Sequence, residues 1–399
     1  MPHDFSSRLP WDRPENALAA LERARRARGE EILDLTVSNP TQVGLSELGP
    51  LVSEALASSA GGEYEPAPAG QPAARAAVAA ELAAEGAPLS PDRLLLTASS
   101  SESYAFLFKL LCDPGDAVLV PEPSYPLFEY LARLEGVTPV PYRLAYDGAW
   151  HVDFASVDEA LTQVRGRARA LIVVNPNNPT GSFLKRFELP ALAARCTAHG
   201  LAVIADEVFA LYAAGDDAEQ VRALAAEPAF TERVLTFALG GLSKACGLPQ
   251  LKLGWMAVAG PAAQADEATA RLTLIADTYL SVGAPVQAAA TRLLAIGREA
   301  RRSIAARVAS NRAQLGASLP ASSRCTLLPS EGGWSALVRV PATRSDEAWA
   351  SALLADDGVL VHPGYFFDLR GGTFLVLSLL PSPEVFAEGT RRLVARCDS

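Results

Sequence analysis

Four kinds of polar side chain with complementary chemistry follow four successive apolar runs. "LLLTASSSES" leads into Ser100 and Ser101, "LIVVNPNNPTG" into Asn178, "LAVIADEV" ends its run at Asp206, and "RVLTFALGGLSK" leads to Lys244. Free N–H groups at a helix start attract phosphate, and a rigid turn can hold an amide donor in place. A buried carboxylate keeps a heterocyclic nitrogen protonated, and a lysine amine can condense with an aldehyde.

Each group also has an interpretation that needs no ligand. Ser99 and Glu102 have the spacing of a helix-capping box, and the asparagine–proline cluster can be a simple rigid turn. Asp206 can cap a helix, and a single lysine is normally a surface charge. The combination decides between them, because an anion cradle, an amide, a carboxylate and a lysine in this order are the set that a pyridoxal phosphate site requires.

The elements that must position these groups indicate a parallel α/β sheet. Between residues 90 and 260, short β-branched or leucine-rich runs alternate with helix-length segments. The expected strands are "RLLLTA", "DAVLVP", "RALIVVNP", "LAVIADE", "RVLTFAL" and "LGWMAVA". Functional groups should gather at their carboxyl ends. Helices are predicted over Gln71 to Gly86 and Ala262 to Leu319, and the tail with "WSALVRVP" and "TFLVLSLLP" predicts a smaller α/β domain.

Composition excludes several classes of protein. With 399 residues, of which 49% are apolar and 20% charged, the chain can bury a large core. The net charge of −10 and the lack of a basic stripe argue against a nucleic-acid partner. No apolar stretch approaches the ~20 residues of a membrane span and the start lacks a signal-peptide core, so we expect a cytoplasmic protein. The five dispersed cysteines predict reduced thiols and no metal site.

The order and spacing of "NPNNPTG", "ADEV" and "GLSK" resemble the class I/II aminotransferases, fold-type I pyridoxal-phosphate enzymes of the aspartate aminotransferase kind. The resemblance runs from "DLTVSNPTQVG" to "TFLVLSLLP". It implies a large pyridoxal-phosphate-binding domain over residues 46–285 and a small domain from residues 1–45 and 286–399. Lys244 would be the Schiff-base lysine and proton carrier, and Asp206 would face the pyridine nitrogen. Asn178 would donate to the phenolic oxygen of the ring and contact the substrate.

The resemblance assigns further residues to cofactor binding. Tyr125 would stack on the ring, Ser100 and Ser101 would bind the phosphate, and Lys252 stands where a phosphate-binding arginine is expected. Tyr64 would reach the phosphate of the neighbouring subunit's cofactor. This implies a homodimer with shared active sites.

Several positions depart from the family pattern. Phe209 replaces a tyrosine that donates to the phenolic oxygen, Gly241 replaces a serine, and Lys252 offers a point charge instead of a bidentate fork. Ser38 stands where a glycine commonly lets the substrate carboxylate approach the backbone, so Ser38 is a candidate substrate contact.

The largest departure is Val376, which occupies the position of the arginine that binds the α-carboxylate. Arg370 lies six residues earlier, roughly 20 Å along a strand, so it cannot substitute in place. Arg339 is another candidate, although a solvent-facing strand position explains it equally well.

The leading hypothesis is a pyridoxal-phosphate aminotransferase that moves an amino group between an amino acid, or a related amine, and an oxo acid. The alternative is a lyase, cyclase or decarboxylase with the same machinery, because Val376 indicates an unusual substrate. A third hypothesis, a pyridoxal-phosphate-binding module without catalysis, is disfavoured by the presence of both Lys244 and Asp206.

Overall fold

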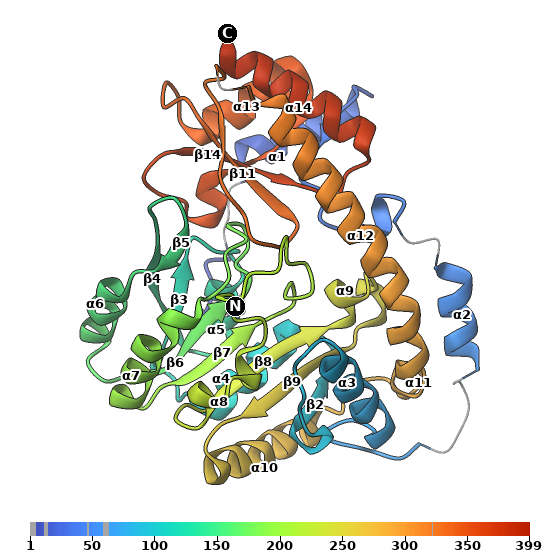
Figure 1. The fold of residues 1–399 in the computed structure, drawn as a ribbon, viewed down its shortest axis with the longest axis vertical. Coiled ribbons are helices and arrows are strands. Elements are labelled where there is room, and N and C mark those ends of the chain that lie inside the picture. Colours follow the sequence, from blue (N-terminus) through green and yellow to red (C-terminus); the bar gives the residue numbers. More distant parts are fainter. Residues whose placement is uncertain (1–4, 12–14, 46–47, 59–63, 321) are drawn as a thin grey trace, which may run out of the picture.

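An eight-stranded sheet forms the centre of the fold, in the order β2-β9-β8-β7-β6-β3-β4-β5 (Figure 1). The computed structural model describes residues 5–11, 15–45, 48–58, 64–320 and 322–399. Strands β8, β7, β6, β3 and β4 are mutually parallel. Strand β9 is antiparallel to both neighbours, and β5 is antiparallel to β4. The predicted mostly parallel sheet is therefore confirmed.

All six predicted runs form strands of this sheet. The complete sheet has eight strands, which are β2 (Leu94–Thr97), β3 (Ala117–Glu122), β4 (Thr138–Tyr146), β5 (Trp150–Val152), β6 (Ala168–Val174), β7 (Ala202–Asp206), β8 (Thr236–Gly241) and β9 (Gly254–Ala259). The sequence did not predict β4 and β5. Strand β4 contains two prolines and is only partly buried, so it lacks the continuous apolar pattern of the inner strands.

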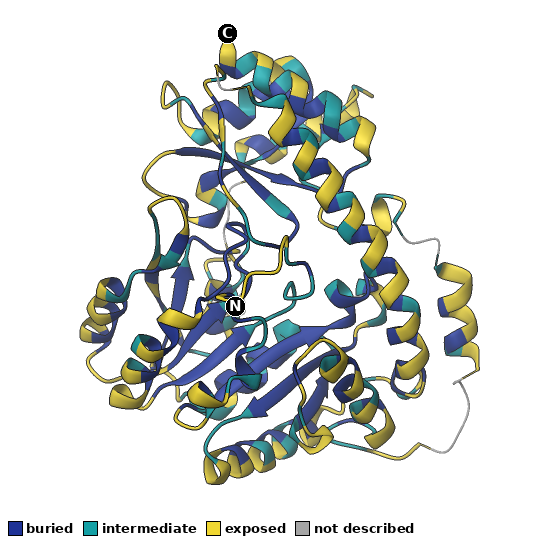
Figure 2. Cartoon of the chain, viewed as in Figure 1, coloured by how far each residue is buried: buried dark blue, intermediate teal, exposed yellow. Residues whose placement is uncertain are grey.

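Helices cover both faces of the sheet. Helix α3 (Pro72–Ala84) packs on one face, and α4 (Ser100–Leu111) and α10 (Ala262–Tyr279) pack on the other. Side chains of β8 alternate between the two faces, because Phe237 and Leu239 join the α4 side whereas Ala238 joins the α3 side. Burial is concentrated in the strands, and the outward helix faces are exposed (Figure 2). The other helices of this part are α2 (Gly49–Ala57), α5 (Phe128–Leu134), α6 (Phe154–Val164), α7 (Leu189–His199), α8 (Pro228–Thr231), α9 (Leu242–Ala245) and α11 (Ala284–Ala288).

A second, smaller region contains an antiparallel sheet in the order β10-β11-β14-β13. Its strands are β10 (Thr326–Leu327), β11 (Ser335–Val340), β13 (His362–Pro363) and β14 (Thr373–Ser378), and β1 (Leu33–Asp34) pairs in parallel with β12 (Val359–Leu360). Helices α1 (Ala17–Ala27), α13 (Asp346–Asp357) and α14 (Pro383–Asp398) belong to it, and α12 (Ala290–Ser318) connects it to the large sheet (Figure 1).

The core of this smaller region joins the two ends of the chain, because Leu18 and Leu35 pack with Trp349 and Phe386. The predicted division into residues 46–285 against 1–45 and 286–399 stays a prediction, and residue 46 itself lies outside the described residues. In the described part of the chain, no helix has the length and apolarity to cross a membrane. The five cysteines are free thiols, and the described residues form no cluster that could hold a metal ion.

Candidate active site

Lys244 lies in the short helix α9, directly after β8. Its Nζ atom is 5.4 Å from the ring centre of Phe209 and 5.2 Å from that of Trp334. Burial lowers the pKa of Lys244, and the negative charge of Asp206 partly opposes this. The hydroxyl of Tyr212 donates to the backbone carbonyl of Lys244 at 2.7 Å, which fixes the turn that carries the amine. The structure therefore presents a buried amine that is held in position and more easily deprotonated than an exposed lysine.

Asp206 is the last residue of β7, the strand beside β8. The hydroxyl of Tyr104, from α4, donates to Asp206 Oδ2 at 3.0 Å, and the N–H of Val208 donates to Oδ1 at 3.3 Å. Burial raises the pKa of Asp206, whereas these hydrogen bonds and the charge of Lys244 lower it. The two predicted catalytic groups thus lie on neighbouring strand ends and stabilise each other's charge.

The asparagine–proline loop after β6 both forms a rigid turn and supplies an amide. Asn175 donates to the carbonyl of Val221 at 2.6 Å, and its own N–H donates to the carbonyl of Asp206 at 2.8 Å. Asn177 donates to the carbonyl of Pro123 at 3.2 Å. Asn178 accepts from the hydroxyl of Ser335 at 3.1 Å, and no described residue accepts from its amide nitrogen. The first two asparagines therefore hold the turn, and Asn178 keeps an available donor.

The serines after β2 lie at the amino end of α4. Ser99 caps the helix, because its hydroxyl accepts from the N–H of Glu102 at 3.3 Å. The Glu102 carboxylate accepts from the N–H of Ala98 at 2.7 Å instead of closing a reciprocal capping box. No described group accepts from the N–H of Ser100 or Ser101, which is usual for a first helical turn and leaves these donors free for an anion.

Close packing between two strands favours a glycine at position 241. A Cβ atom there would lie 3.1 Å from Gly254 Cα and 3.2 Å from the carbonyl oxygen of Leu253. Gly254 in turn lies against the serine turn, since its own Cβ would be 3.2 Å from the carbonyl carbon of Ser99. Strands β8 and β9 thus approach too closely at this point for a serine at position 241 without a backbone shift.

Four predicted site residues make no direct contact with the catalytic pair. Tyr125 is 51% exposed, with its ring centre 6.4 Å from that of Phe367, and Tyr64 is 67% exposed. Lys252 is exposed in a left-handed conformation with φ of 53°, and Ser38 is exposed and donates to the carbonyl of Thr36 at 3.2 Å. Within the described residues, no hydrogen bond, ion pair or ring contact joins any of the four to the catalytic pair.

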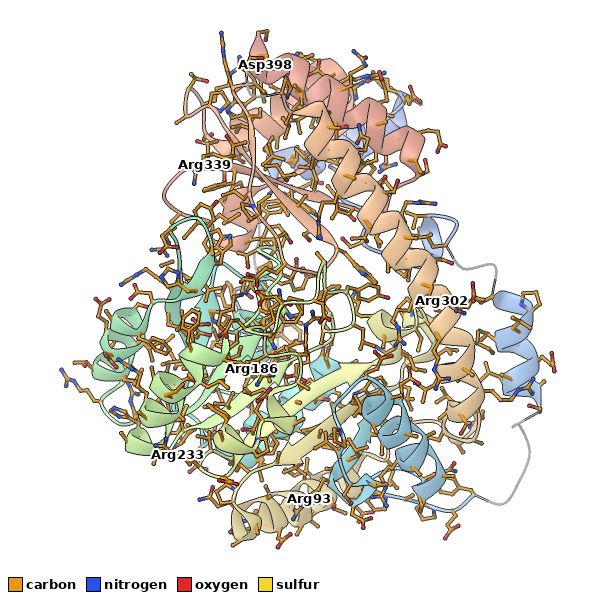
Figure 3. All side chains as sticks on the ribbon, viewed as in Figure 1. Arg93, Arg186, Arg233, Arg302, Arg339 and Asp398 are labelled. Atoms are coloured by element: carbon orange, nitrogen blue, oxygen red, sulfur yellow. The ribbon has the colours of Figure 1, made fainter. Side chains whose placement is uncertain are left out.

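Neither of the two arginines that the sequence offered takes the place expected at Val376. Val376 is 2% exposed and belongs to an apolar cluster with Leu337 and Phe367. Arg370 is highly exposed and pairs with Glu122 at 3.1 Å. Arg339 is an exposed residue of β11 and lies at the outer edge of the smaller region (Figure 3). Neither alternative arginine contacts the catalytic pair.

Sequence reasoning missed three aromatic residues of the site. Tyr104 contacts Asp206 from α4, Tyr212 contacts the backbone of Lys244, and Trp334 reaches the site from the smaller region. The ring of Trp334 packs edge-on against Phe209, with 5.1 Å between ring centres. Its indole N–H is buried without a hydrogen-bond partner among the described residues. Of these three residues, only Tyr104 could have been found from the sequence, because it follows the serine turn at helical spacing.

This fold and this lysine–aspartate site define an α/β protein with a buried lysine amine close to a buried carboxylate. The family described as aminotransferase class I and II matches residues 30–385, and the chain belongs to this family. An alanine aminotransferase of Mycobacterium tuberculosis is 31% identical over 267 residues, which cover 65% of this chain and 59% of that protein. An arginine–pyruvate transaminase of Pseudomonas aeruginosa is 29% identical and covers 98% of this chain and 96% of that protein.

Solved structures agree with this assignment of fold. The alanine aminotransferase of Pyrococcus furiosus superposes with a TM-score of 0.84 at 24% identity and covers 99% of each chain. The N-succinyldiaminopimelate aminotransferase of Mycobacterium tuberculosis superposes with a TM-score of 0.78 at 27% identity, covering 98% of this chain and 100% of that one. The predicted family and fold class are therefore confirmed.

Proposed function

We propose that this protein is a pyridoxal-phosphate-dependent aminotransferase that transfers an amino group between an amino acid, or a related amine, and an oxo acid. The observation that carries the proposal is the buried Lys244 amine beside the buried Asp206 carboxylate, at the carboxyl ends of neighbouring parallel strands. Family membership supports the same activity.

The donors and charges around this pair fit the cofactor. The amino end of α4 offers free N–H groups for a phosphate, and Asp206 offers a buried carboxylate for a pyridinium nitrogen. Asn178 and Trp334 each offer a donor that no described residue uses. Bound pyridoxal phosphate supplies an electron sink for the carbon that carries the amino group.

The chain's own residues then have distinct tasks. Lys244 would hold the cofactor through its aldehyde group, and its Nζ atom would carry the proton that the transfer requires. Its lowered pKa keeps a larger neutral fraction available for both steps. Asp206 holds the pyridine nitrogen protonated, and Tyr104 orients that carboxylate by its hydrogen bond of 3.0 Å. Ser100 and Ser101 bind the phosphate, with Lys252 as a solvent-side charge.

The valine at position 376 supports a second candidate function. A valine that is 2% exposed stands where the resemblance expects the carboxylate-binding arginine, so that position supplies no cation to a substrate. This favours either an unusual amino substrate or a lyase, cyclase or decarboxylase reaction with the same cofactor. Ser38 and Asn178 are the remaining proposed substrate contacts.

The test is to load the protein with pyridoxal phosphate, record its absorption spectrum and add single amino acids and amines. We expect conversion of the cofactor to its pyridoxamine form together with one oxo product for each amino group transferred. Carbon dioxide or an elimination product, without an oxo acid, would instead establish the second function. Lys244→Ala is the control, and turnover at the parental rate in this variant would refute the site.

We further propose a homodimer with shared sites. Tyr64 is 67% exposed and lies in a surface hollow with Leu280, and Leu274 and Tyr279 nearby on α10 are 70% and 50% exposed. Such an apolar group is typical of a protein interface. Sedimentation would show a dimer, and mixing Lys244→Ala with Tyr64→Ala subunits would restore activity, since one site of each hybrid has both residues. Two inactive parents whose mixture stays inactive would refute the shared site.

A further inference from the structure

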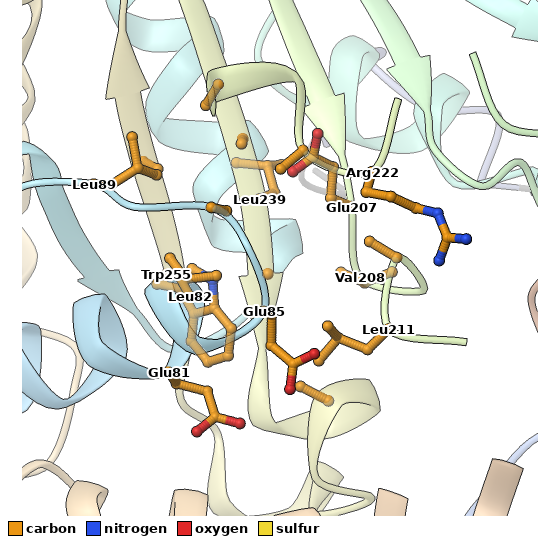
Figure 4. Close-up of a pocket in the computed structure, with 18 of the residues that line it drawn as sticks. Glu81, Leu82, Glu85, Leu89, Glu207, Val208, Leu211, Arg222, Leu239 and Trp255 are labelled. Carbon is orange, nitrogen blue, oxygen red and sulfur yellow. The ribbon is translucent and has the colours of Figure 1, made fainter. Parts of the chain in front are cut away.

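A cavity of about 190 Å³ lies on the face of the sheet that α3 covers (Figure 4). Successive strand residues point to opposite faces, and Asp206 and Glu207 follow this rule. Asp206 contacts Tyr104 on the α4 side, whereas Glu207 lines the cavity with Leu82 of α3. Lys244 and Asp206 are not among the lining residues, so this cavity is separate from the proposed active site.

Part of the wall is apolar, and one unused donor lies in it. Leu82, Leu89 and Leu211 line the cavity. The indole of Trp255 packs directly over Gly240, because a Cβ atom there would lie 2.3 Å from the indole nitrogen. Trp255 is only 5% exposed and lines the cavity, and no described residue accepts from its indole N–H. This nitrogen is therefore open to a water or to an acceptor on a ligand in the cavity.

Glu207 gives the cavity an uncompensated carboxyl group. One of its oxygens accepts from the N–H of Leu224 at 2.7 Å, and no described lysine or arginine pairs with it. The charges that act on it come from Asp206 and Glu227, and both are negative. Burial raises the pKa of Glu207 to about 8, and the hydrogen bond from Leu224 opposes this only in part.

The remaining charged groups do not neutralise Glu207. Glu81 and Glu85 line the α3 side and are both paired with Arg301, and Glu81 also pairs with Arg298. Arg222 lies at the rim, but its guanidinium is stacked 5.2 Å from the ring centre of Phe183 and turns away from the cavity (Figure 4). Carboxyl groups thus surround a space that has no free cation among the described residues.

We propose that this cavity is a second ligand site, which binds a small organic amine with a compact apolar body. The ammonium group would pair with Glu207, and the body would fill the space lined by Leu82, Leu211 and Trp255. The volume exceeds the roughly 150 Å³ of an apolar cavity that admits benzene, so a single ring fits. A hydroxyl or ether oxygen on the ligand would accept from Trp255.

The probe is N,N-dimethylbenzylamine, titrated into the cofactor-loaded protein by calorimetry at pH 7. A tertiary amine cannot condense with an aldehyde, so the probe cannot react at the cofactor. Its uncharged isostere, isobutylbenzene, is the matched ligand control. We expect saturable binding of the amine with release of a proton, because Glu207 is largely protonated at pH 7 when its pKa is about 8 and ionises on pairing. Buffers of different ionisation enthalpy measure that proton.

Three variants locate the binding. Glu207→Gln keeps an acceptor for Leu224 and should weaken the amine about tenfold or more while leaving the isostere unchanged. Ala223→Leu fills the rim and should weaken both ligands. Lys244→Ala should abolish amino transfer but keep the probe site, which separates this proposal from the proposed function. Absence of saturable binding, equal affinity in Glu207→Gln, or equal affinity of amine and isostere would overturn the amine site.

Discussion

The buried carboxyl group of Glu207 predicts that the protein loses stability as the pH rises towards 8. Burial raises the pKa of Glu207 from 4.5 to about 8 in the folded chain. Because the folded pKa exceeds the unfolded one, its contribution to stability is complete below about pH 4.5 and is lost as the pH rises through 8. Each pH unit inside this window costs about 1.4 kcal/mol.

Between pH 6 and pH 8 this group alone should lower the free energy of unfolding by roughly 2.3 kcal/mol, because half of the folded molecules have already ionised it at pH 8. Glu207→Gln cannot ionise and still accepts the N–H of Leu224, which now lies 2.7 Å from the glutamate oxygen. The variant should therefore gain stability over the parent by that amount as the pH rises across this interval. Glu232→Gln changes the net charge equally at an exposed position and is the matched control.

The assay is urea unfolding of parent, variant and control, followed by far-ultraviolet circular dichroism at pH 6, 7 and 8. We expect the parent and Glu232→Gln to lose stability in parallel and Glu207→Gln to lose much less. If the stability difference between Glu207→Gln and the parent were the same at all three pH values, Glu207 would be ionised normally. The reasoning about its burial would then be refuted.

Three further predictions test the site and its support. Tyr104→Phe removes the donor 3.0 Å from the Asp206 carboxylate and should weaken pyridoxal phosphate binding about tenfold, measured by fluorescence quenching; unchanged affinity would contradict the orienting role. Gly240→Ala forces a Cβ to within 2.3 Å of the indole packed over it and should lower stability by about 1–3 kcal/mol in calorimetry, whereas Gly215→Ala, with open space around its Cβ, should not. Arg370→Ala breaks only an exposed ion pair and should change the KM for any oxo acid less than about twofold; a tenfold rise would make it the missing carboxylate binder.

Much of the fold could be predicted because the inner strands are buried on both faces. "LIVV", "AVIA" and "VLTFAL" are continuous apolar runs, and such runs bounded by polar residues indicate strands of a covered parallel sheet. Strands β4 and β5, at one end of the sheet, escaped prediction, because β4 is partly exposed and β5 has only three residues. The chain order of Asn178, Asp206 and Lys244 followed from the same strands.

The sequence alone determined the family, the mostly parallel sheet and the lysine and aspartate at its strand ends, because these depend on local runs and their spacing. Only the tertiary structure decided which residues surround that pair. Tyr104 and Trp334 reach it from other elements, and the close approach of β9 explains Gly241. The different surroundings of Asp206 and Glu207 also required the fold, because adjacent strand residues face opposite sides and only the helices packed there give each carboxyl group its partners.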